Sequence, residues 1–393
     1  MTQSSVMDGA LVSEVTPVPA LDVGLQNGPL RGEIDAAIGR VCDSGQFIHG
    51  PECQRFEIAL AKYCGVPHAI GCASGSDALL LALMALNMGS GDEVILPSFT
   101  FFATAGAVWR LGAKPVFVDI EPRSFNLDPT LIQQAITPAT KAIIPVHLFG
   151  RCADMTAIGA VARAHALSVI EDAAQAIGAE HDGCRAGSMG AIGCFSFYPT
   201  KNLGGFGDGG ILTTHDGDLA EQLRVLRDHG QHPRYFHSAV GVNSRLDSIQ
   251  AAVLNVKLGR LEQWTQRRID NAARYAEWFA EVGLDQVIGL PEADPSGRAV
   301  WNQYTIRVPG GRRDALVEHL SRHRIGTAVY YPLPLHRQEC FKSLGYQRNS
   351  LPETEQAADE VLSLPIFPGL TERQQRTVVA QIAAFYRADG ALN

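Results

Sequence analysis

One lysine stands out among the residues that could do chemistry. Six of the 33 basic residues are lysines, and only Lys201 lies between an apolar run, residues 191–197, and a Gly-rich stretch. A lysine sheltered in such a loop loses part of its solvation, which lowers its pKa and leaves the amine neutral and nucleophilic. An amine in that state can attack an aldehyde. The alternative interpretation is a surface lysine beside a turn.

A second feature is a segment of small residues, 73–78, between an apolar run and a helical pattern. Gly75 permits close approach of the backbone, Ser76 offers a hydroxyl, and a helix start presents free N–H groups to an anion. Ser196, near the end of a predicted strand, can reach a phosphate at the same place. Neither a P-loop nor a dinucleotide-binding glycine pattern is present, which disfavours nucleoside triphosphates and dinucleotides. A plain serine-capped helix is the alternative.

The adjacent acids Glu171 and Asp172 close another apolar run. An acid at the carboxyl end of a strand can hold a protonated ring nitrogen, which a pyridinium cofactor needs to act as an electron sink. Hydrolysis by two carboxylates is disfavoured, because neighbours on a strand point to opposite faces and would not flank one bond. A solvated strand end is the alternative.

An aromatic run at residues 99–102 follows the predicted strand that ends at Pro97. One of its rings could stack on a planar heterocycle, although such runs more commonly pack in a core. Taken jointly, the four features supply a phosphate cradle, a ring-stacking side chain, a carboxylate for a ring nitrogen and a lysine for an aldehyde. These are the groups that pyridoxal phosphate requires.

The elements that must position these residues alternate along the chain from about Val66. The sequence predicts strands at 68–72, 94–97, 115–120, 142–148, 167–171, 191–197 and 210–214, with helices at 76–88, 102–111, from 128–129 onward and at about 154–166. Strands alternating with helices at this spacing predict an α/β fold with a largely parallel sheet covered on both faces. The four features fall at strand ends, where ligands bind in such sheets.

At 393 residues the chain is long enough for two domains. An apolar stripe without proline predicts one long helix over residues 247–281, which would lead out of the first domain. Short strands at 304–308 and 327–331 and a helix at 372–386 predict a smaller α+β domain. We therefore expect a mobile leader at 1–20, a large domain at 21–265 and a small domain at 266–393.

Composition restricts the class of protein. The net charge of −8 makes nucleic acids and anionic membranes poor partners in general. No signal peptide, transit peptide or membrane span is recognisable. The eight scattered cysteines form no C-x-x-C pair, which fits buried thiols in a reducing cytoplasm. His229, His232 and His237 lack a second ligand pair of familiar spacing, so no metal site is expected.

From about Gly45 onward, the chain resembles the DegT/DnrJ/StrS family of sugar aminotransferases, a branch of the fold-type I pyridoxal-phosphate enzymes. The matching segments are residues 74–79 (SGSDAL), 97–101 (PSFTF), 171–175 (EDAAQ), 195–202 (FSFYPTKN), 207–210 (GDGG) and 241–252 (GVNSRLDSIQAA). Six ordered motifs over most of the chain make the resemblance specific. Two positions depart slightly, with Ser76 where many members have threonine and Phe101 where tyrosine or tryptophan can occur.

The resemblance implies roles for the residues around the cofactor. Lys201 would bind the aldehyde of pyridoxal phosphate covalently and would shuttle the proton. Asp172 would pair with the ring nitrogen, Gln175 would approach the ring hydroxyl, and Phe101 would stack on the ring.

The remaining roles concern the phosphate and the substrate. Gly75, Ser76 and Ser196 would bind the cofactor's phosphate. Asn243 would reach that phosphate from a neighbouring subunit, so that a homodimer with shared active sites would be required. Arg245, in the same loop, would face the sugar nucleotide or its acidic group.

The implied reaction moves an amino group from glutamate to a keto-sugar linked to a nucleotide, in a ping-pong sequence through pyridoxamine phosphate. The loop at 241–246 and the stretch at 330–336 slightly favour amination at C3 over C4. Sugar dehydratases on this scaffold replace the lysine with histidine, which disfavours that alternative here. A regulatory protein without turnover and a cysteine desulfurase using Cys340 are further alternatives. Tyr330, Tyr331 and His336 could line the substrate cleft or simply pack.

Overall fold

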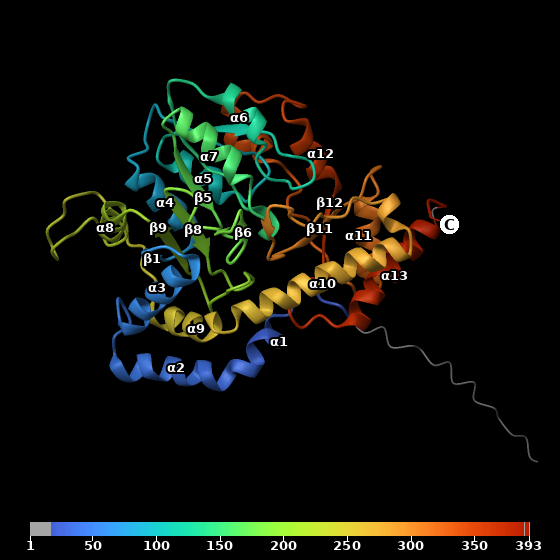
Figure 1. The fold of residues 1–393 in the computed structure, drawn as a ribbon, viewed down its shortest axis with the longest axis horizontal. Helices are drawn as coiled ribbons and strands as arrows, with labels where there is room; N and C mark the ends of the chain where they lie inside the picture. Colours follow the sequence, from blue (N-terminus) through green and yellow to red (C-terminus); the bar gives the residue numbers. More distant parts are fainter. Residues whose placement is uncertain (1–16, 389, 393) are drawn as a thin grey trace, which may run out of the picture.

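The computed structural model describes residues 17–388 and 390–392. The described part of the chain forms a large layered body and a smaller lobe near the C-terminus (Figure 1). No helix among the described residues is long and apolar enough to cross a membrane. The predicted leader at 1–20 falls mostly on residues 1–16, outside this range.

A seven-stranded mixed sheet is the centre of the large body (Figure 1). Its strands, in spatial order, are β1 (His68–Cys72), β9 (Gly210–Thr214), β8 (Ile192–Ser196), β5 (Ser168–Asp172), β4 (Thr140–Ile143), β2 (Glu93–Pro97) and β3 (Lys114–Val118). Only β9 runs against its neighbours β1 and β8, and the other pairs are parallel. The predicted α/β class with a mostly parallel sheet is therefore confirmed.

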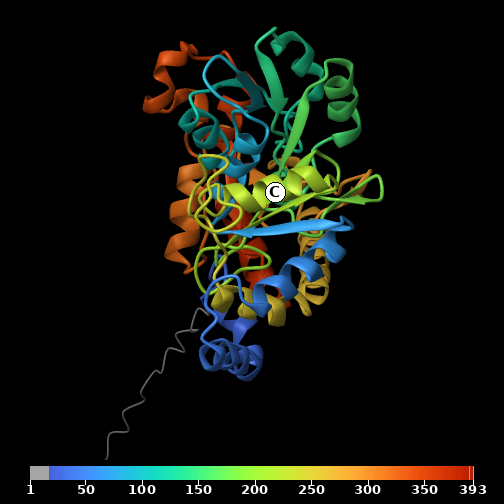
Figure 2. The ribbon, with the colours of Figure 1, turned by 90° about the vertical axis from the view of Figure 1, so that its left-hand side faces the viewer.

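Helices cover both faces of the sheet because its side chains alternate between two apolar cores. On one face, Ile70 and Val94 pack with α4 (Gly75–Ala85), α5 (Ala103–Arg110) and α8 (Gly217–Leu226). On the other, Ala69 packs with α3 (Pro51–Cys64) and α9 (Ser248–Leu258), and Ile95 packs with α6 (Pro129–Ala135) and α7 (Met155–Ala164). Figures 1 and 2 show α3 and α9 on the same side of the sheet.

Local signals explain where several of these helices begin. Asp128 caps α6 by accepting a hydrogen bond from the Thr130 N–H at 2.9 Å, and Pro129 occupies the first helical position. Ser74 caps α4 in the same way by accepting from the Asp77 N–H at 3.1 Å. α3 ends at Gly65, whose φ of 75° is the left-handed conformation that glycine adopts readily. The Ser74 cap thus determines where α4, the helix beside the predicted anion site, begins.

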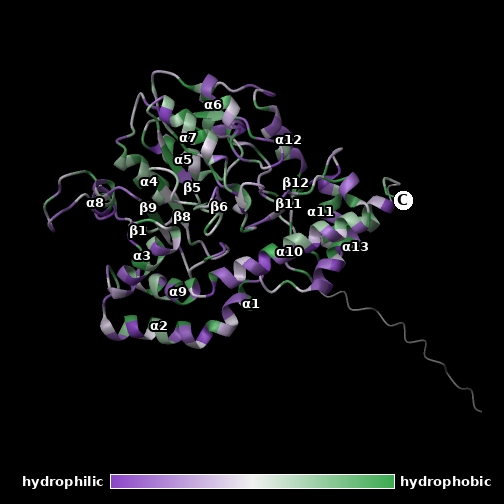
Figure 3. Ribbon diagram, in the orientation of Figure 1, coloured by the Kyte–Doolittle hydropathy of each residue, from purple (hydrophilic) through white to green (hydrophobic). Residues whose placement is uncertain are grey.

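The single long helix predicted at 247–281 is wrong in one respect. The structure divides it into α9 and α10 (Leu261–Glu281), with the break at Gly259 and Arg260. α10 reaches from the core of the large body, where Leu261 is buried, into the core of the small lobe, where Ala272 and Phe279 are buried. In Figure 3, α10 shows both apolar and polar turns, as expected of a helix with one buried face.

The small lobe contains a two-stranded antiparallel sheet of β11 (Tyr304–Arg307) and β12 (Val361–Leu364), packed with α10, α11 (Arg313–Arg322) and α13 (Glu372–Ala388). The strand predicted at 327–331 is wrong: only Ala328 makes an isolated bridge, to Ser363. β12, which the sequence analysis missed, takes its place beside β11.

The predicted domain boundaries stay predictions. α10 lies across the proposed boundary at 265/266 and contributes to both cores. At the other end, Val18 is buried in the small lobe, donates to the Arg324 carbonyl at 2.9 Å and accepts from the Gly326 N–H at 2.8 Å. The described end of the predicted leader is therefore packed rather than mobile.

The remaining elements complete the described chain. They are α1 (Val23–Asn27), η1 (Gly28–Leu30), α2 (Arg31–Ser44), η2 (Leu148–Gly150), β6 (Glu180–His181), β7 (Cys184–Arg185), η3 (Leu284–Gln286), β10 (Gly297–Arg298), η4 (Leu335–Arg337), η5 (Glu339–Leu344) and α12 (Pro352–Glu360).

Candidate active site

A cavity of about 520 Å³ opens at the carboxyl ends of β5 and β8. Open α/β sheets bind their ligands at this position. The residues that line it include seven of the nine predicted site residues, namely Gly75, Ser76, Phe101, Asp172, Gln175, Ser196 and Lys201. Segments far apart in the sequence are thus brought to one place.

Lys201 lies inside this cavity, on the loop that follows β8. Burial lowers the pKa of its amine to about 8, and the nearby negative charge of Asp172 only partly opposes this effect. Its loop is held by the Lys201 N–H, which donates to the Tyr198 carbonyl at 2.9 Å, and by Asn202, which donates to the Val300 carbonyl at 2.9 Å. The protein therefore presents an amine of lowered pKa on a loop that hydrogen bonds hold in place.

Asp172 ends β5 and is buried. It accepts hydrogen bonds from the Thr104 hydroxyl at 2.7 Å and the Ala174 N–H at 3.3 Å, and Thr104 is also within 3.0 Å of the Thr100 hydroxyl. Burial raises the pKa of the Asp172 carboxyl despite these bonds. A cationic ring nitrogen beside it would stabilise the ionised form, so the residue suits a pyridinium.

Glu171 points to the opposite face of β5, as the alternation of strand side chains predicts. Its carboxylate accepts hydrogen bonds from the Gly187, Met189 and Gly190 N–H groups at 2.6–2.7 Å. It also lies 2.9 Å from Nε2 of the fully buried His147. The two adjacent acids therefore have different roles. Asp172 faces the cavity, and Glu171 holds the loop before β8.

Glu171→Ala should destabilise the fold by about 3–5 kcal/mol, because three N–H groups and His147 would lose a buried charged partner. The midpoint of urea denaturation measures the effect. Glu339→Ala, which removes an exposed carboxylate, is the control and should change stability by less than about 0.5 kcal/mol. Equal midpoints for the two variants would contradict the structural role of Glu171.

The anion cradle is built from the start of α4 and the end of β8. A Cβ atom added to Gly75 would lie 2.6 Å from the Ser196 Cβ, so that only glycine fits between the two segments. Gly75 and Ser76, the first two residues of this eleven-residue helix, line the cavity together with Ser196, and the first N–H groups of a helix have no partner within it. The close approach of backbone and hydroxyl groups fits a phosphate.

Gln175 and Phe101 line the cavity beside Tyr331. The Gln175 side chain accepts from the Phe149 N–H at 2.7 Å and donates to the Tyr331 hydroxyl at 3.2 Å. Phe101 is 56% exposed, and its ring centroid is 6.3 Å from that of Tyr331. An aromatic face with this much free area can cover a planar heterocycle.

Asn243 and Arg245 do not line the cavity. Asn243 is exposed, and its backbone forms an isolated antiparallel β-bridge with Asp228. The Arg245 side chain donates to the Asp228 carboxylate at 2.9 Å. Their predicted contact with a neighbouring subunit's site is not addressed by a single chain and stays a prediction.

Several residues near the site were missed from the sequence. Thr104 reaches Asp172 only through the fold, and Gln303 lines the cavity from the small lobe. The buried Lys257 of α9 donates to the Gly204 carbonyl, in the loop that carries Lys201, and burial lowers its pKa to about 8. Tyr330 and Tyr331, which could equally have packed, line the cavity.

The fold and this constellation define a pyridoxal-phosphate enzyme of the fold-type I class. The buried carboxylate, the amine of lowered pKa and the glycine cradle are the features that a pyridinium ring, an aldehyde and a phosphate require. A sequence model of the DegT/DnrJ/EryC1/StrS aminotransferase family matches residues 30–383. The chain belongs to this family, and its cofactor is pyridoxal phosphate.

Similar proteins carry names of two kinds. A protein of Geobacillus stearothermophilus named "pleiotropic regulatory protein" is 52% identical over 94% of this chain and 99% of its own length. A UDP-N-acetyl-3-dehydro-alpha-D-glucosamine 3-aminotransferase of Acidithiobacillus ferrooxidans is 47% identical over 96% of this chain and 99% of its own. The crystal structure of DesV from S. venezuelae, in complex with a ketimine intermediate, has a TM-score of 0.91 at 46% identity and covers 94% of this chain and 98% of its own.

Proposed function

We propose that the protein transfers the amino group of glutamate to C3 of a keto-sugar attached to a nucleoside diphosphate. The observation that carries the proposal is the pairing of Lys201 with Asp172 in one cavity at the strand ends. The 3-aminotransferase of A. ferrooxidans, similar over nearly its full length, supports the sugar nucleotide and the C3 position.

The residues of the chain divide the reaction among them. Pyridoxal phosphate, when bound, supplies the electron sink for cleavage of the C–H bond. Asp172 would keep the ring nitrogen protonated, and Gly75, Ser76 and Ser196 would hold the phosphate. The neutral Lys201 amine would take the proton from the donor's α-carbon and return a proton in the second half of the reaction.

An assay with defined substrates tests the proposal. Glutamate alone should convert the bound cofactor to its amino form and release 2-oxoglutarate. The amino-loaded protein should then aminate a nucleotide-linked 3-keto-sugar, with the product identified by mass spectrometry and NMR. If glutamate leaves the cofactor's absorption unchanged and no keto-sugar of a 3-keto and 4-keto panel is aminated, the proposal is wrong.

The lowered pKa of Lys201 predicts how cofactor uptake depends on pH. Below about 8 the amine is protonated and unreactive, and above about 8 it is neutral, whereas an ordinary lysine changes near 10.5. The rate at which the cofactor-free protein forms its visible absorption band with pyridoxal phosphate should therefore rise with pH and level off above about 8. Stopped-flow absorbance measures this profile. A rate still rising steeply from pH 9 to pH 10.5 would contradict the sheltered amine.

We also propose a homodimer in which Asn243 of each subunit reaches the phosphate in the other's site, with Arg245 facing the sugar nucleotide there. Five large apolar side chains are exposed on neighbouring segments, as expected of an interface: Phe47, Ile48, Tyr235, Phe236 and Val240. In Figure 1, the loop between α8 and α9 extends outward beyond the sheet.

Mixing two inactive variants tests the shared site. Asn243→Ala and Lys201→Ala damage different subunits' contributions to one site, so a mixed dimer contains one intact site. We expect activity to reappear after the two variants are unfolded together and refolded. Two Lys201→Ala preparations treated in the same way are the control and should stay inactive. Absence of recovery in the mixture would contradict the shared site.

We place the protein in the cytoplasm, a proposal supported by its cysteines. All eight are free thiols and five are buried, as in proteins of a reducing compartment.

The regulatory alternative gains weight from the name of the Geobacillus relative. The glutamate half-reaction separates the two functions, because a protein without turnover would not convert its cofactor.

A further inference from the structure

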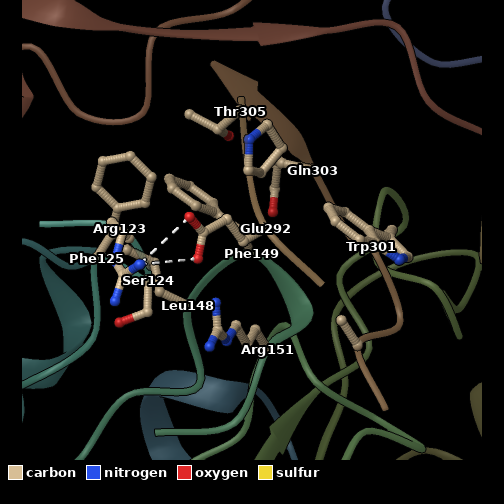
Figure 4. A pocket seen from close by; sticks show the side chains of 12 residues that line it. Arg123, Ser124, Phe125, Leu148, Phe149, Arg151, Glu292, Trp301, Gln303 and Thr305 are labelled. Atoms are coloured by element: carbon tan, nitrogen blue, oxygen red, sulfur yellow. Dashed lines mark hydrogen bonds and ion pairs between the residues drawn. The ribbon is translucent and has the colours of Figure 1, made fainter. Parts of the chain in front are cut away.

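Gln303 stands in the wall between the active-site cavity and two smaller cavities. One of these, of about 60 Å³, also borders Thr200 and Tyr330. The other, of about 30 Å³, lies between the large body and the small lobe and is lined by Arg123, Arg151 and Glu292 (Figure 4). The side chain therefore borders the reaction space on one side and two small separate spaces on the other.

The backbone before Gln303 is fixed against the loop of Lys201. The Val300 N–H donates to the Gly150 carbonyl at 2.8 Å, and the Asn302 N–H donates to the Phe149 carbonyl at 3.0 Å. The Asn302 side chain donates to the Asn202 amide oxygen at 3.0 Å, and Asn202 follows Lys201 directly. The residue before Gln303 is thus hydrogen-bonded to the residue that follows the catalytic lysine.

The side-chain amide of Gln303 makes no hydrogen bond within the described chain. Its Oε1 atom is buried and has no hydrogen-bond partner there, whereas both ends of the Gln175 amide are bonded. A buried polar atom without a partner is unfavourable, so a ligand or a water is expected to satisfy it. The guanidinium groups of Arg123 and Arg151, each paired with a carboxylate at 3.4–3.9 Å, border the 30 Å³ cavity, and their N–H donors favour the amide oxygen on that side. That orientation leaves the NH₂ group for the active-site cavity.

The cavity offers such a donor few charged competitors, although serine, threonine and tyrosine hydroxyls also line it. Among the described residues that line it, only Asp172, Lys201 and Asp208 carry charge, and none is a guanidinium. A ping-pong enzyme must admit two different substrates in turn, here an acidic amino acid and a sugar ring. A neutral amide can donate to a carboxylate and to a hydroxyl alike, whereas a fixed cation would favour the carboxylate alone.

We propose that Gln303 is a specificity-determining residue that donates a hydrogen bond to both substrates, to a carboxylate of the amino donor and to a hydroxyl of the sugar. This inference rests on the proposed function and adds the group that recognises both substrates in the same cavity.

The two half-reactions, followed separately by the cofactor's absorbance, test the inference. Gln303→Glu should raise the glutamate concentration for half-maximal rate about ten- to a hundredfold, because two carboxylates would then face each other. The reaction with the amino-sugar nucleotide should change less, since a sugar hydroxyl can donate to the new carboxylate. Gln303→Leu should weaken both half-reactions, because no donor remains.

Controls separate recognition from folding. Gln303→Asn keeps the amide but withdraws it by one methylene, and should lie between wild type and Gln303→Leu in both half-reactions. Gln356→Glu introduces the same charge at an exposed site of α12 and should match the wild type. Unchanged melting temperature and cofactor absorbance in the variants assign the effect to substrate binding.

Two results would overturn the inference. One is unchanged half-reactions in both Gln303→Glu and Gln303→Leu, and the other is a loss confined to a single substrate in Gln303→Leu. If the wild-type protein aminates no sugar and is not converted by glutamate, the proposed function fails instead. The wild-type and variant arms therefore distinguish the two failures.

Discussion

Replacing Lys201 with alanine should lower the rate of amino transfer by at least about a thousandfold, because general acid–base catalysis alone contributes about 10²–10⁴. The variant also loses the amine that binds the aldehyde, so the visible absorption of the lysine-bound cofactor should disappear. Single-turnover conversion by glutamate, at saturating pyridoxal phosphate, measures the loss directly. The size of the effect reflects two roles lost together, attachment and proton transfer.

Lys62→Ala is the matched control, because Lys62 is an exposed lysine at the end of α3. It should keep both the rate and the absorption band. A Lys201→Ala protein that retains the band and more than about a tenth of the rate would show that another group carries the proton.

Asp172→Asn should lower the rate of amino transfer by about two to four orders of magnitude. The substitution keeps the shape of the side chain and the Thr104 contact but removes the negative charge. Loss of one partner of a buried ion pair costs about 3–5 kcal/mol, and about 1.4 kcal/mol corresponds to a tenfold change in rate. The kcat for the glutamate half-reaction should fall far more than the affinity for glutamate, because the ring nitrogen acts during C–H cleavage.

Asp208→Asn controls for a change of charge in the same cavity, since Asp208 lines it but is exposed. The Asp208 variant should keep a rate within about tenfold of the wild type. If Asp172→Asn were as active as Asp208→Asn, the carboxylate would not hold the ring nitrogen. A large loss of thermal stability in Asp172→Asn is not expected, since burial already raises the pKa of this carboxyl.

Much of the large body could be predicted because its signals are local. The strands are short apolar runs separated by helices with capping residues, and six of the seven predicted strands have bounds within two residues of the observed ones. The strand predicted at 142–148 is displaced, because β4 spans Thr140–Ile143. Glycine between a strand and a helix, as at Gly75, reports a close approach of backbone that the structure shows. The same reasoning placed Lys201 and Asp172 at strand ends, and parallel strands bring those ends together.

The errors arise where tertiary contacts override local pattern. The predicted helix at 247–281 has no proline, and only a glycine marks the break at Gly259. The apolar stretch at 327–331 looked like a strand, but Tyr330 and Tyr331 form part of the cavity wall and not a ladder. The short run of β12 follows α12 directly, so no turn signal separates it.

The missed site residues share a different cause. Lys257 is a lysine inside a helix, a type that usually faces solvent, and only the packed structure shows that it is buried and bonded to Gly204. Thr104 and Gln303 lie 68 and 131 positions from Asp172, so no spacing in the sequence connects them to it. Such residues become visible only once the sheet and the small lobe are assembled.

Identifying the lysine that holds pyridoxal phosphate tests the role of Lys201 directly. The purified protein with bound pyridoxal phosphate is reduced with borohydride, digested and analysed by mass spectrometry. We expect the reduced cofactor on Lys201, with the other five lysines unlabelled. A label on Lys257 or another lysine, or no label despite bound cofactor, would contradict that role.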